Sequence, residues 1–187
     1  MNTKTKKLST VSMVLCGMFA ALVAIGAFIQ IPVPYMDYFT LQFFFVLLAG
    51  LILGADKGAI SVGGYVLLGL VGVPIFAAGG GIGYIFRPSF GYLVGFIVSA
   101  YVTGKVCEKL KASYKNYLLA CLAGFVVTYA IGIVYKFIIL NFYAHTPATL
   151  GVIFLSCFPL DMPGDFVLCL LAAGVGLRMR KSGFYLS

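Results

Sequence analysis

The chain has 187 residues, of which 62% are hydrophobic and 10% are charged, and its formal net charge is +8 at pH 7. A soluble domain has roughly 45–50% apolar and about 25% charged residues, so this composition excludes an ordinary soluble fold. The five cysteines form no C-x-x-C pair and, with the single histidine, give no metal-binding spacing. We therefore predict an integral membrane protein in contact with the lipid bilayer, with no metal site and no bound nucleic acid.

Six apolar segments are predicted to cross the bilayer, since a membrane helix needs roughly 20 mostly apolar residues and tolerates fewer inside a bundle. The first is longer than the roughly 7–15 apolar residues of a signal peptide, so we expect it to remain as a helix. A seventh stretch, 148–160, is bracketed by prolines and is predicted to be a short capping or re-entrant helix. We expect one all-α membrane domain over residues 1–187, a compact bundle of six transmembrane helices. The predicted spans are 11–31, 40–54, 59–70, 91–106, 117–142 and 165–177.

Basic residues predict the orientation, because Lys and Arg accumulate in short cytoplasmic loops. The two ends and alternate loops hold 11 of the 13 basic residues. They are Lys4, Lys6, Lys7, Lys57, Lys105, Lys109, Lys111, Lys115, Arg178, Arg180 and Lys181. The opposite loops hold Arg87 alone, and Lys136 lies within the fifth span. An even number of crossings in the cell membrane, with both termini cytoplasmic, satisfies this pattern, and the same residues would attract anionic lipid.

Three of the five acidic residues, Asp37, Asp161 and Asp165, are predicted to lie on the outer side with Arg87 and Lys136. A charge in or near the bilayer is costly, so each needs a partner or a function. Asp165 opens the sixth predicted span, where capping of the helix is an equally good interpretation. Lys136 could extend to the outer headgroups, and Arg87 could be an exposed loop residue.

The loop between the third and fourth spans is long, apolar and rich in glycine, including Gly79, Gly80 and Gly81. It does not fit a dinucleotide-binding fingerprint, because Gly81-x-Gly83 is followed by Phe86 where a glycine is required. Glycine permits close approach of a ligand, and irregular backbone at membrane depth occurs only where protein or a cavity covers it. The loop therefore predicts a covered ligand pocket on the outer side.

Several motifs stand in a fixed order along nearly the whole chain. They are Ile31-Pro32-Val33-Pro34 with Thr40-Leu41-Gln42, Gly72-Val73-Pro74-Ile75-Phe76 through Gly79-Gly80-Gly81 to Pro88-Ser89-Phe90-Gly91-Tyr92-Leu93, and Pro163-Gly164-Asp165. This set closely resembles the BioY family, the biotin-specific substrate-binding subunits (S components) of energy-coupling-factor (ECF) transporters. The resemblance implies six membrane helices, high-affinity biotin binding near the outer face, and uptake together with a transmembrane coupling subunit and two ATPase subunits.

The implied ligand has chemical counterparts in the sequence, and no cofactor is implied. Biotin offers a ureido ring with two N–H donors, a thioether ring and a carboxylate tail. Asp165 matches the family motif and would accept the ureido N–H groups, while Arg87 or Lys136 would neutralise the tail. Aromatic side chains would pack on the thioether ring, and amides would supply hydrogen bonds. These further candidates are Phe76, Tyr84, Tyr92, Gln42, Gly79, Gly80 and Gly81.

The chain departs from the family pattern at two places. The family often has a lysine three positions after the aspartate, where this chain has Leu168. The usual double glycine before the tyrosine is Phe90-Gly91. One hypothesis is that Lys136 or Arg87 supplies the charge of the missing lysine.

The first span carries a strip of small residues. Ala20 and Ala24 are four positions apart and share a helix face with close neighbours Gly17 and Ala21, which allows another helix to approach. Packing inside the bundle is one interpretation. The resemblance favours the other, because S components use an alanine pair of this kind to dock the coupling subunit.

The sequence disfavours an enzyme and leaves two other kinds of transport protein as alternatives. The chain contains no Walker lysine loop, and no base is placed near Ser89, since His145 lies in another outer loop, so we predict that it is not an enzyme. One alternative is a stand-alone proton-coupled carrier in which Asp165 or Lys136 titrates. Another is an S component for a different vitamin.

Overall fold

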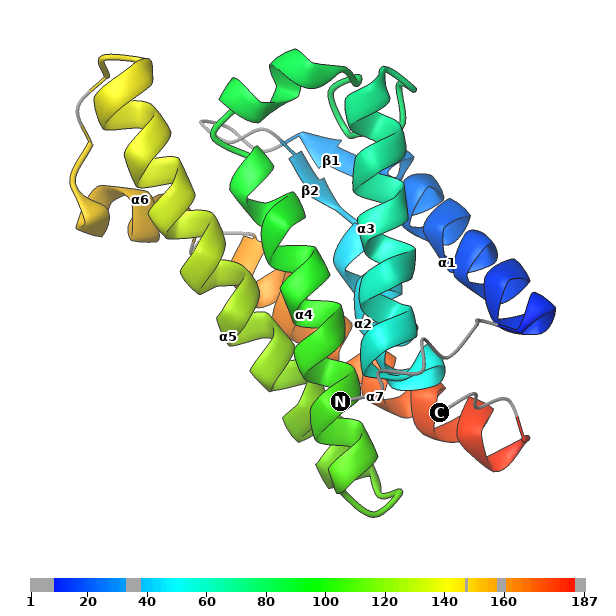
Figure 1. Cartoon of the computed structure of the whole chain (residues 1–187). Coiled ribbons are helices and arrows are strands. Elements are labelled where there is room, and N and C mark those ends of the chain that lie inside the picture. The colour runs from blue at the N-terminus through cyan, green and yellow to red at the C-terminus, as the bar shows by residue number, and fades with distance from the viewer. Residues whose placement is uncertain (1–8, 33–37, 147, 158–160, 184–187) are drawn as a thin grey trace, which may run out of the picture.

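The computed structural model describes residues 9–32, 38–146, 148–157 and 161–183, and this part of the chain forms a helical bundle with one small hairpin (Figure 1). Lys4, Lys6, Lys7, Val33, Pro34 and Asp37 of the sequence predictions lie outside these residues. The elements in chain order are α1 (Thr10–Phe28), β1 (Gln30–Pro32), β2 (Tyr38–Thr40), α2 (Gln42–Leu53), α3 (Ala55–Val71), η1 (Ile82–Phe86), α4 (Phe90–Lys109), α5 (Tyr114–Ile138), η2 (Ile139–Tyr143), α6 (Leu150–Cys157) and α7 (Asp161–Lys181).

Each of the six predicted spans overlaps a helix, the fifth overlapping both α5 and η2, and α6 lies within the predicted short stretch 148–160. Among the described residues, α1, α4, α7 and the continuous helix Tyr114–Tyr143 are long and apolar enough to cross a membrane. The helix α2 has only 12 residues and α3 has 17, so a count of six crossings stays a prediction. The short α2 is tolerated because ten of its 12 residues are buried among other helices.

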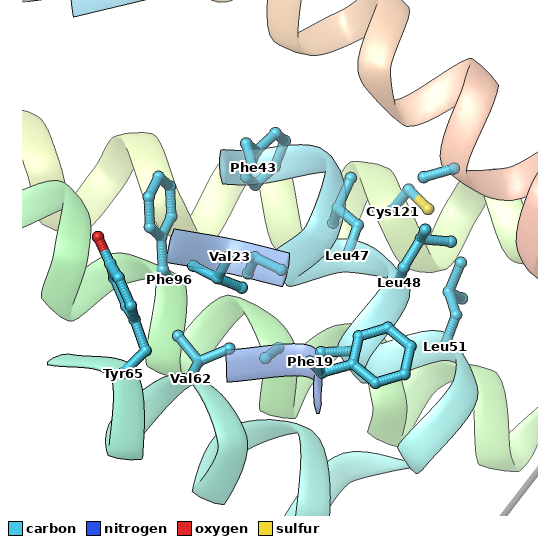
Figure 2. Packing of buried hydrophobic residues seen from close by; sticks show 14 of the residues in the cluster. Phe19, Val23, Phe43, Leu47, Leu48, Leu51, Val62, Tyr65, Phe96 and Cys121 are labelled. Carbon is cyan, nitrogen blue, oxygen red and sulfur yellow. The ribbon is translucent and has the colours of Figure 1, made fainter. Parts of the chain in front are cut away.

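The helix α2 forms the centre of the bundle and contacts α1, α3, α4 and α7. Figure 2 shows side chains from several helices meeting around it. Phe19 and Val23 of α1 pack from one side, and Phe96 of α4 packs from another, with Phe43 of α2 stacked on Phe96 at 5.9 Å between ring centroids. Leu47 of α2 is fully buried. This core packs α2 on several sides, which places its first residue, Gln42, at one end of the bundle.

Two glycines permit the sharp turn between α2 and α3 and its close packing on α4. Gly54 ends α2 with a φ of 82°, a conformation that favours glycine. A Cβ added to Gly104 of α4 would lie 2.6 Å from the Cα of Ala55, so only glycine fits beside this turn. The turn and α4 are therefore in backbone contact, which fixes one end of the bundle.

The hairpin of β1 and β2 was not predicted from the sequence. The two strands pair antiparallel, with Gln30 opposite Thr40 and Ile31 opposite Phe39. The predicted first span, which ran to residue 31, and the second, which began at 40, were therefore wrong at these ends. In Figure 1 the hairpin and η1 lie at one end of the bundle, and the α2–α3 turn, the α4–α5 turn and the end of α7 lie at the other. The chain is thus a multi-pass membrane protein. One end of its bundle carries the hairpin, and the other carries the helix-connecting turns.

Candidate ligand-binding site

A cavity of about 400 Å³ lies where the hairpin, η1 and the adjoining helix ends meet. Small-molecule sites have volumes of roughly 300–1,000 Å³, so a ligand of vitamin size fits this range. Its lining residues come from β2, α2, η1, α4, α5, η2 and α7 and from the loop residues between them. The cavity is lined by Phe39, Thr40, Gln42, Phe43, Ala77, Tyr84, Pro88, Ser89, Tyr92, Leu93, Phe96, Tyr129, Lys136, Leu140, Asp161 and Asp165.

Two carboxylates of α7 line the cavity. Asp161 and Asp165 are four residues apart and therefore share one helix face. Tyr129 of α5 donates a hydrogen bond of 2.8 Å from its hydroxyl to Oδ2 of Asp165. Since α7 begins at Asp161, Asp165 lies beyond the first turn, so the interpretation of Asp165 as the helix cap was wrong. Its carboxylate is held at the cavity wall by a neighbouring helix.

Lys136 of α5 lines the same cavity as these carboxylates. It lies seven residues, or two helical turns, after Tyr129, which places both side chains on one face of α5. The Lys136 ammonium is also 3.5 Å from the hydroxyl of Ser156 in α6. The cavity therefore combines acceptor groups on α7 with a cation on α5.

Aromatic side chains form much of the remaining wall. The rings of Tyr92 and Tyr129 meet edge to face at 5.8 Å between centroids. Tyr84 is buried and packs against Phe76, with ring centroids 4.6 Å apart. A wall of this kind suits an apolar ring or a thioether, which interact favourably with aromatic rings.

Gln42, the first residue of α2, has a fixed orientation at the cavity. Its Nε2 donates to the hydroxyl of Tyr65 at 2.5 Å, and its Oε1 accepts from the hydroxyl of Thr40 at 3.2 Å. Tyr65 in turn donates to the carbonyl of Ile75. An amide has two N–H groups and two lone pairs, so one of each remains for a ligand.

The three predicted glycines, Gly79, Gly80 and Gly81, are not among the described residues that line this cavity. Gly81 donates its N–H to the carbonyl of Gly69 at 2.7 Å, and Gly79 donates to Phe76 at 3.2 Å. A Cβ on Gly80 would collide with the backbone of Val73. The N–H groups of Gly79 and Gly81 are thus used to close the loop and to tie it to α3, and Gly80 allows the loop to pack closely.

Phe76 and Arg87 also lie outside the cavity wall, as defined by the described residues. The ring of Phe76 is 1% exposed and packs over Gly69 of α3. Arg87 is exposed to solvent, and its guanidinium lies 5.3 Å from the ring centroid of Tyr84, which itself lines the cavity. Lys136, rather than Arg87, is the predicted cation that the fold brings into the site.

Asp161, Tyr129 and Ser89 line the cavity but were not predicted as site residues. For the first two, helical spacing from a predicted residue could have indicated their position. Asp161 precedes Asp165 by about one helical turn, and Tyr129 precedes Lys136 by two, so each pair is expected on one face of its helix. Ser89 carries no such signal. Its hydroxyl is buried and has no hydrogen-bond partner among the described residues, which leaves it for a bound ligand.

The chain matches the model of the BioY family over residues 1–183. It is 40% identical over 177 residues to a protein of Lysinibacillus sphaericus named as a probable biotin transporter BioY, with 94% of this chain and 90% of that protein covered. It is 39% identical over 169 residues to the biotin transporter BioY of Thermotoga maritima, covering 88% and 93% of the two chains.

A solved structure, that of the S component for biotin from an ECF-type ABC transporter, is also similar. It superposes with a TM-score of 0.82 at 25% sequence identity, covering 99% of this chain and 97% of the other. The family match, the relatives and the shared fold agree along almost the full length of the chain. The chain belongs to the BioY family.

Proposed function

We propose that the chain binds biotin in the cavity described above and mediates its uptake as the S component of an ECF-type transporter. The observation that carries the proposal is the arrangement of charge within one cavity. Asp165, held by Tyr129, lies on α7, and Lys136 lies on α5. Biotin needs acceptors for its ureido N–H groups and a cation for its carboxylate tail, and this cavity contains both.

The aromatic and amide groups support the same orientation of the ligand. The ureido ring would donate to Asp165, since a charged acceptor gives the stronger hydrogen bonds. The fused thioether ring would pack between Tyr84 and Tyr92, and the valerate carboxylate would meet Lys136. Gln42 would add one further hydrogen bond with its remaining N–H group.

We extend the proposal to the partners. The sequence has no Walker loop, so ATP hydrolysis would belong to two ATPase subunits, and a transmembrane coupling subunit would contact this chain. The chain itself would not be an enzyme. On α1, Ala20 and Ala24 are half-buried, while Gly17 and Ala21 are exposed. The face available to the coupling subunit therefore centres on Gly17 and Ala21, with the two predicted alanines at its edge.

We also propose that both termini lie in the cytoplasm. The α4–α5 turn and the end of α7, which carry basic residues, lie at the end of the bundle opposite the hairpin (Figure 1). By the positive-inside rule this end would be cytoplasmic, and the cavity would then lie near the outer face.

Equilibrium binding of labelled biotin to the detergent-purified chain tests the ligand. We expect saturable binding that unlabelled biotin competes and that thiamine and riboflavin do not. Absence of saturable biotin binding would contradict the proposal, and competition by another vitamin would favour an S component of different specificity. Uptake into vesicles with and without the coupling subunit and ATPases, at a clamped proton gradient, separates this function from a stand-alone proton-coupled carrier.

A further inference from the structure

The short helix α6 is attached firmly to α5, beside which it lies in Figure 1. Asn141 of η2 receives the backbone N–H of Ala148 on its Oδ1 at 3.2 Å and donates from Nδ2 to the carbonyl of Ala148 at 2.9 Å. One face of α6 is buried, with Ile153 2% exposed and Cys157 fully buried, whereas Leu155 is 66% exposed. The helix therefore has a defined inner face directed at the bundle.

The end of this inner face contacts a residue of the cavity wall. The sulfur of Cys157 lies 3.1 Å from the hydroxyl of Tyr92. Tyr92 packs edge to face on Tyr129, which donates to Asp165. The position of α6 is therefore tied to the aromatic and acidic part of the site.

The preceding residue, Ser156, contacts the cation of the site. Its hydroxyl donates to the carbonyl of Ile153 at 2.6 Å and lies 3.5 Å from the Lys136 ammonium. A hydroxyl has a single proton, and here the Ile153 carbonyl accepts it. The lone pairs of Ser156 consequently act toward Lys136 as acceptors, and the rotamer of Ser156 is fixed by the helix to which it belongs.

We propose that Ser156 is a positioning residue that orients the Lys136 ammonium toward the carboxylate of the bound ligand, so that α6 determines selectivity for an anionic ligand. The inference rests on the proposed binding of biotin. A lysine side chain has four rotatable bonds and loses about 1.5–2 kcal/mol of rotamer entropy when ordered. An acceptor on α6 restricts the ammonium before the ligand arrives, which reduces the entropy that remains to be lost on binding.

The test compares biotin with its uncharged methyl ester, because only biotin presents a carboxylate to Lys136. Dissociation constants are measured for the unaltered chain, Ser156→Ala, Ser156→Thr and Lys136→Met. The double variant Ser156→Ala/Lys136→Met completes the cycle, and Leu155→Ala is the control on the exposed face of α6. All variants are measured as full-length purified protein.

We expect Ser156→Ala to weaken biotin binding by about threefold to tenfold, the range of one modest hydrogen bond, and to leave the ester unchanged. Ser156→Thr, which retains the hydroxyl, should restore biotin binding, and Leu155→Ala should have no effect. In the Lys136→Met background, Ser156→Ala should cause no further loss, because the group on which it acts is gone.

Two results would overturn the inference while leaving the proposed function intact. One is an equal loss of biotin and ester in Ser156→Ala, which indicates general damage to the fold. The other is the same loss with and without Lys136, which indicates that Ser156 acts independently. If the unaltered chain binds neither ligand, the proposed function and this inference both fail.

Discussion

The hydroxyl of Tyr129 donates a 2.8 Å hydrogen bond to Oδ2 of Asp165, which links α5 to α7 at the wall of the cavity. The same helix, α5, supplies Lys136 two turns later. The packing of α5 on α7 thus brings Asp165, the proposed acceptor, and Lys136, the proposed cation, into the wall of one cavity. The relative position of α5 and α7 is therefore what defines the site.

Replacement of Asp165 tests the acceptor. Asp165→Ala removes the proposed acceptor of both ureido N–H groups, and each charge-assisted hydrogen bond contributes roughly 1.5–3 kcal/mol. We expect biotin affinity to fall by at least about 100-fold, measured by equilibrium binding. Asp56→Ala, an exposed acid at the start of α3, is the control and should bind normally. Unchanged affinity in Asp165→Ala would contradict the assigned site.

Tyr129→Phe tests the link between α5 and α7. The substitution keeps the ring that packs on Tyr92 and removes only the hydroxyl that holds Asp165. We expect biotin to bind about threefold to tenfold more weakly, as for loss of one hydrogen bond. Tyr101→Phe, at a partly exposed tyrosine of α4, controls for the chemical change itself. Equal effects of the two substitutions would show that the contact with Asp165 does not matter.

The two candidate cations can be compared directly. Lys136 lines the cavity, whereas Arg87 is exposed and lies against Tyr84. We expect Lys136→Met to weaken biotin binding much more than Arg87→Met, and to affect the methyl ester little. Both variants are measured by the same binding assay at two salt concentrations. The reverse order of effects would assign the ligand carboxylate to Arg87.

Gly104→Ala tests the backbone contact between α4 and the α2–α3 turn. Alanine normally stabilises a helix over glycine by up to about 1 kcal/mol. At Gly104, however, the added Cβ would lie 2.6 Å from the Cα of Ala55, and backbone cannot move aside cheaply. We expect destabilisation of about 1–3 kcal/mol, measured by thermal unfolding in detergent.

Gly63→Ala is the matched control for this change, because nothing lies within 4 Å of a Cβ added there in the middle of α3. We expect it to be neutral or slightly stabilising. A Gly104→Ala protein as stable as Gly63→Ala would show that the turn can shift away from α4.

The proposed partner face is tested by enlarging one of its small residues. Ala21→Trp fills the exposed strip of α1, so we expect ATP-dependent biotin uptake to be lost while biotin binding by the isolated chain is unchanged. Val126→Trp, at an exposed position of α5, is the control, because it lies on a different helix from the proposed face. Normal uptake by Ala21→Trp would exclude this face as the docking surface.

The positions of the helices were largely predictable because the length of an apolar run is a local property. The predicted spans 59–70 and 91–106 lie within α3 and α4. The ends were predicted less well. The first predicted span ran on to Ile31, but residues 30–32 form β1, in which Gln30 pairs with Thr40, and this pairing depends on the return of the chain.

The candidate site shows the same division between local and long-range information. The motif resemblance pointed to Gln42, Tyr84, Tyr92 and Asp165, and the fold brings all four into the wall of one cavity, while their contact with a ligand stays a prediction. It also included Gly79 and Gly81, whose N–H groups donate to Phe76 and to Gly69 of α3, and no sequence pattern reveals where a loop amide points.

The sequence by itself thus determined three things. Composition indicated the class of protein, short motifs carried the family resemblance, and apolar runs predicted the helices. Each run or motif is formed by residues close together in the chain. Which charged groups share a cavity was decided only by tertiary structure. Lys136 and Asp165 are 29 positions apart, and it is the packing of α5 on α7 that brings both into the wall of one cavity. Arg87 is only three residues from the lining residue Tyr84 and lies against its ring, yet it is exposed and does not belong to the cavity wall.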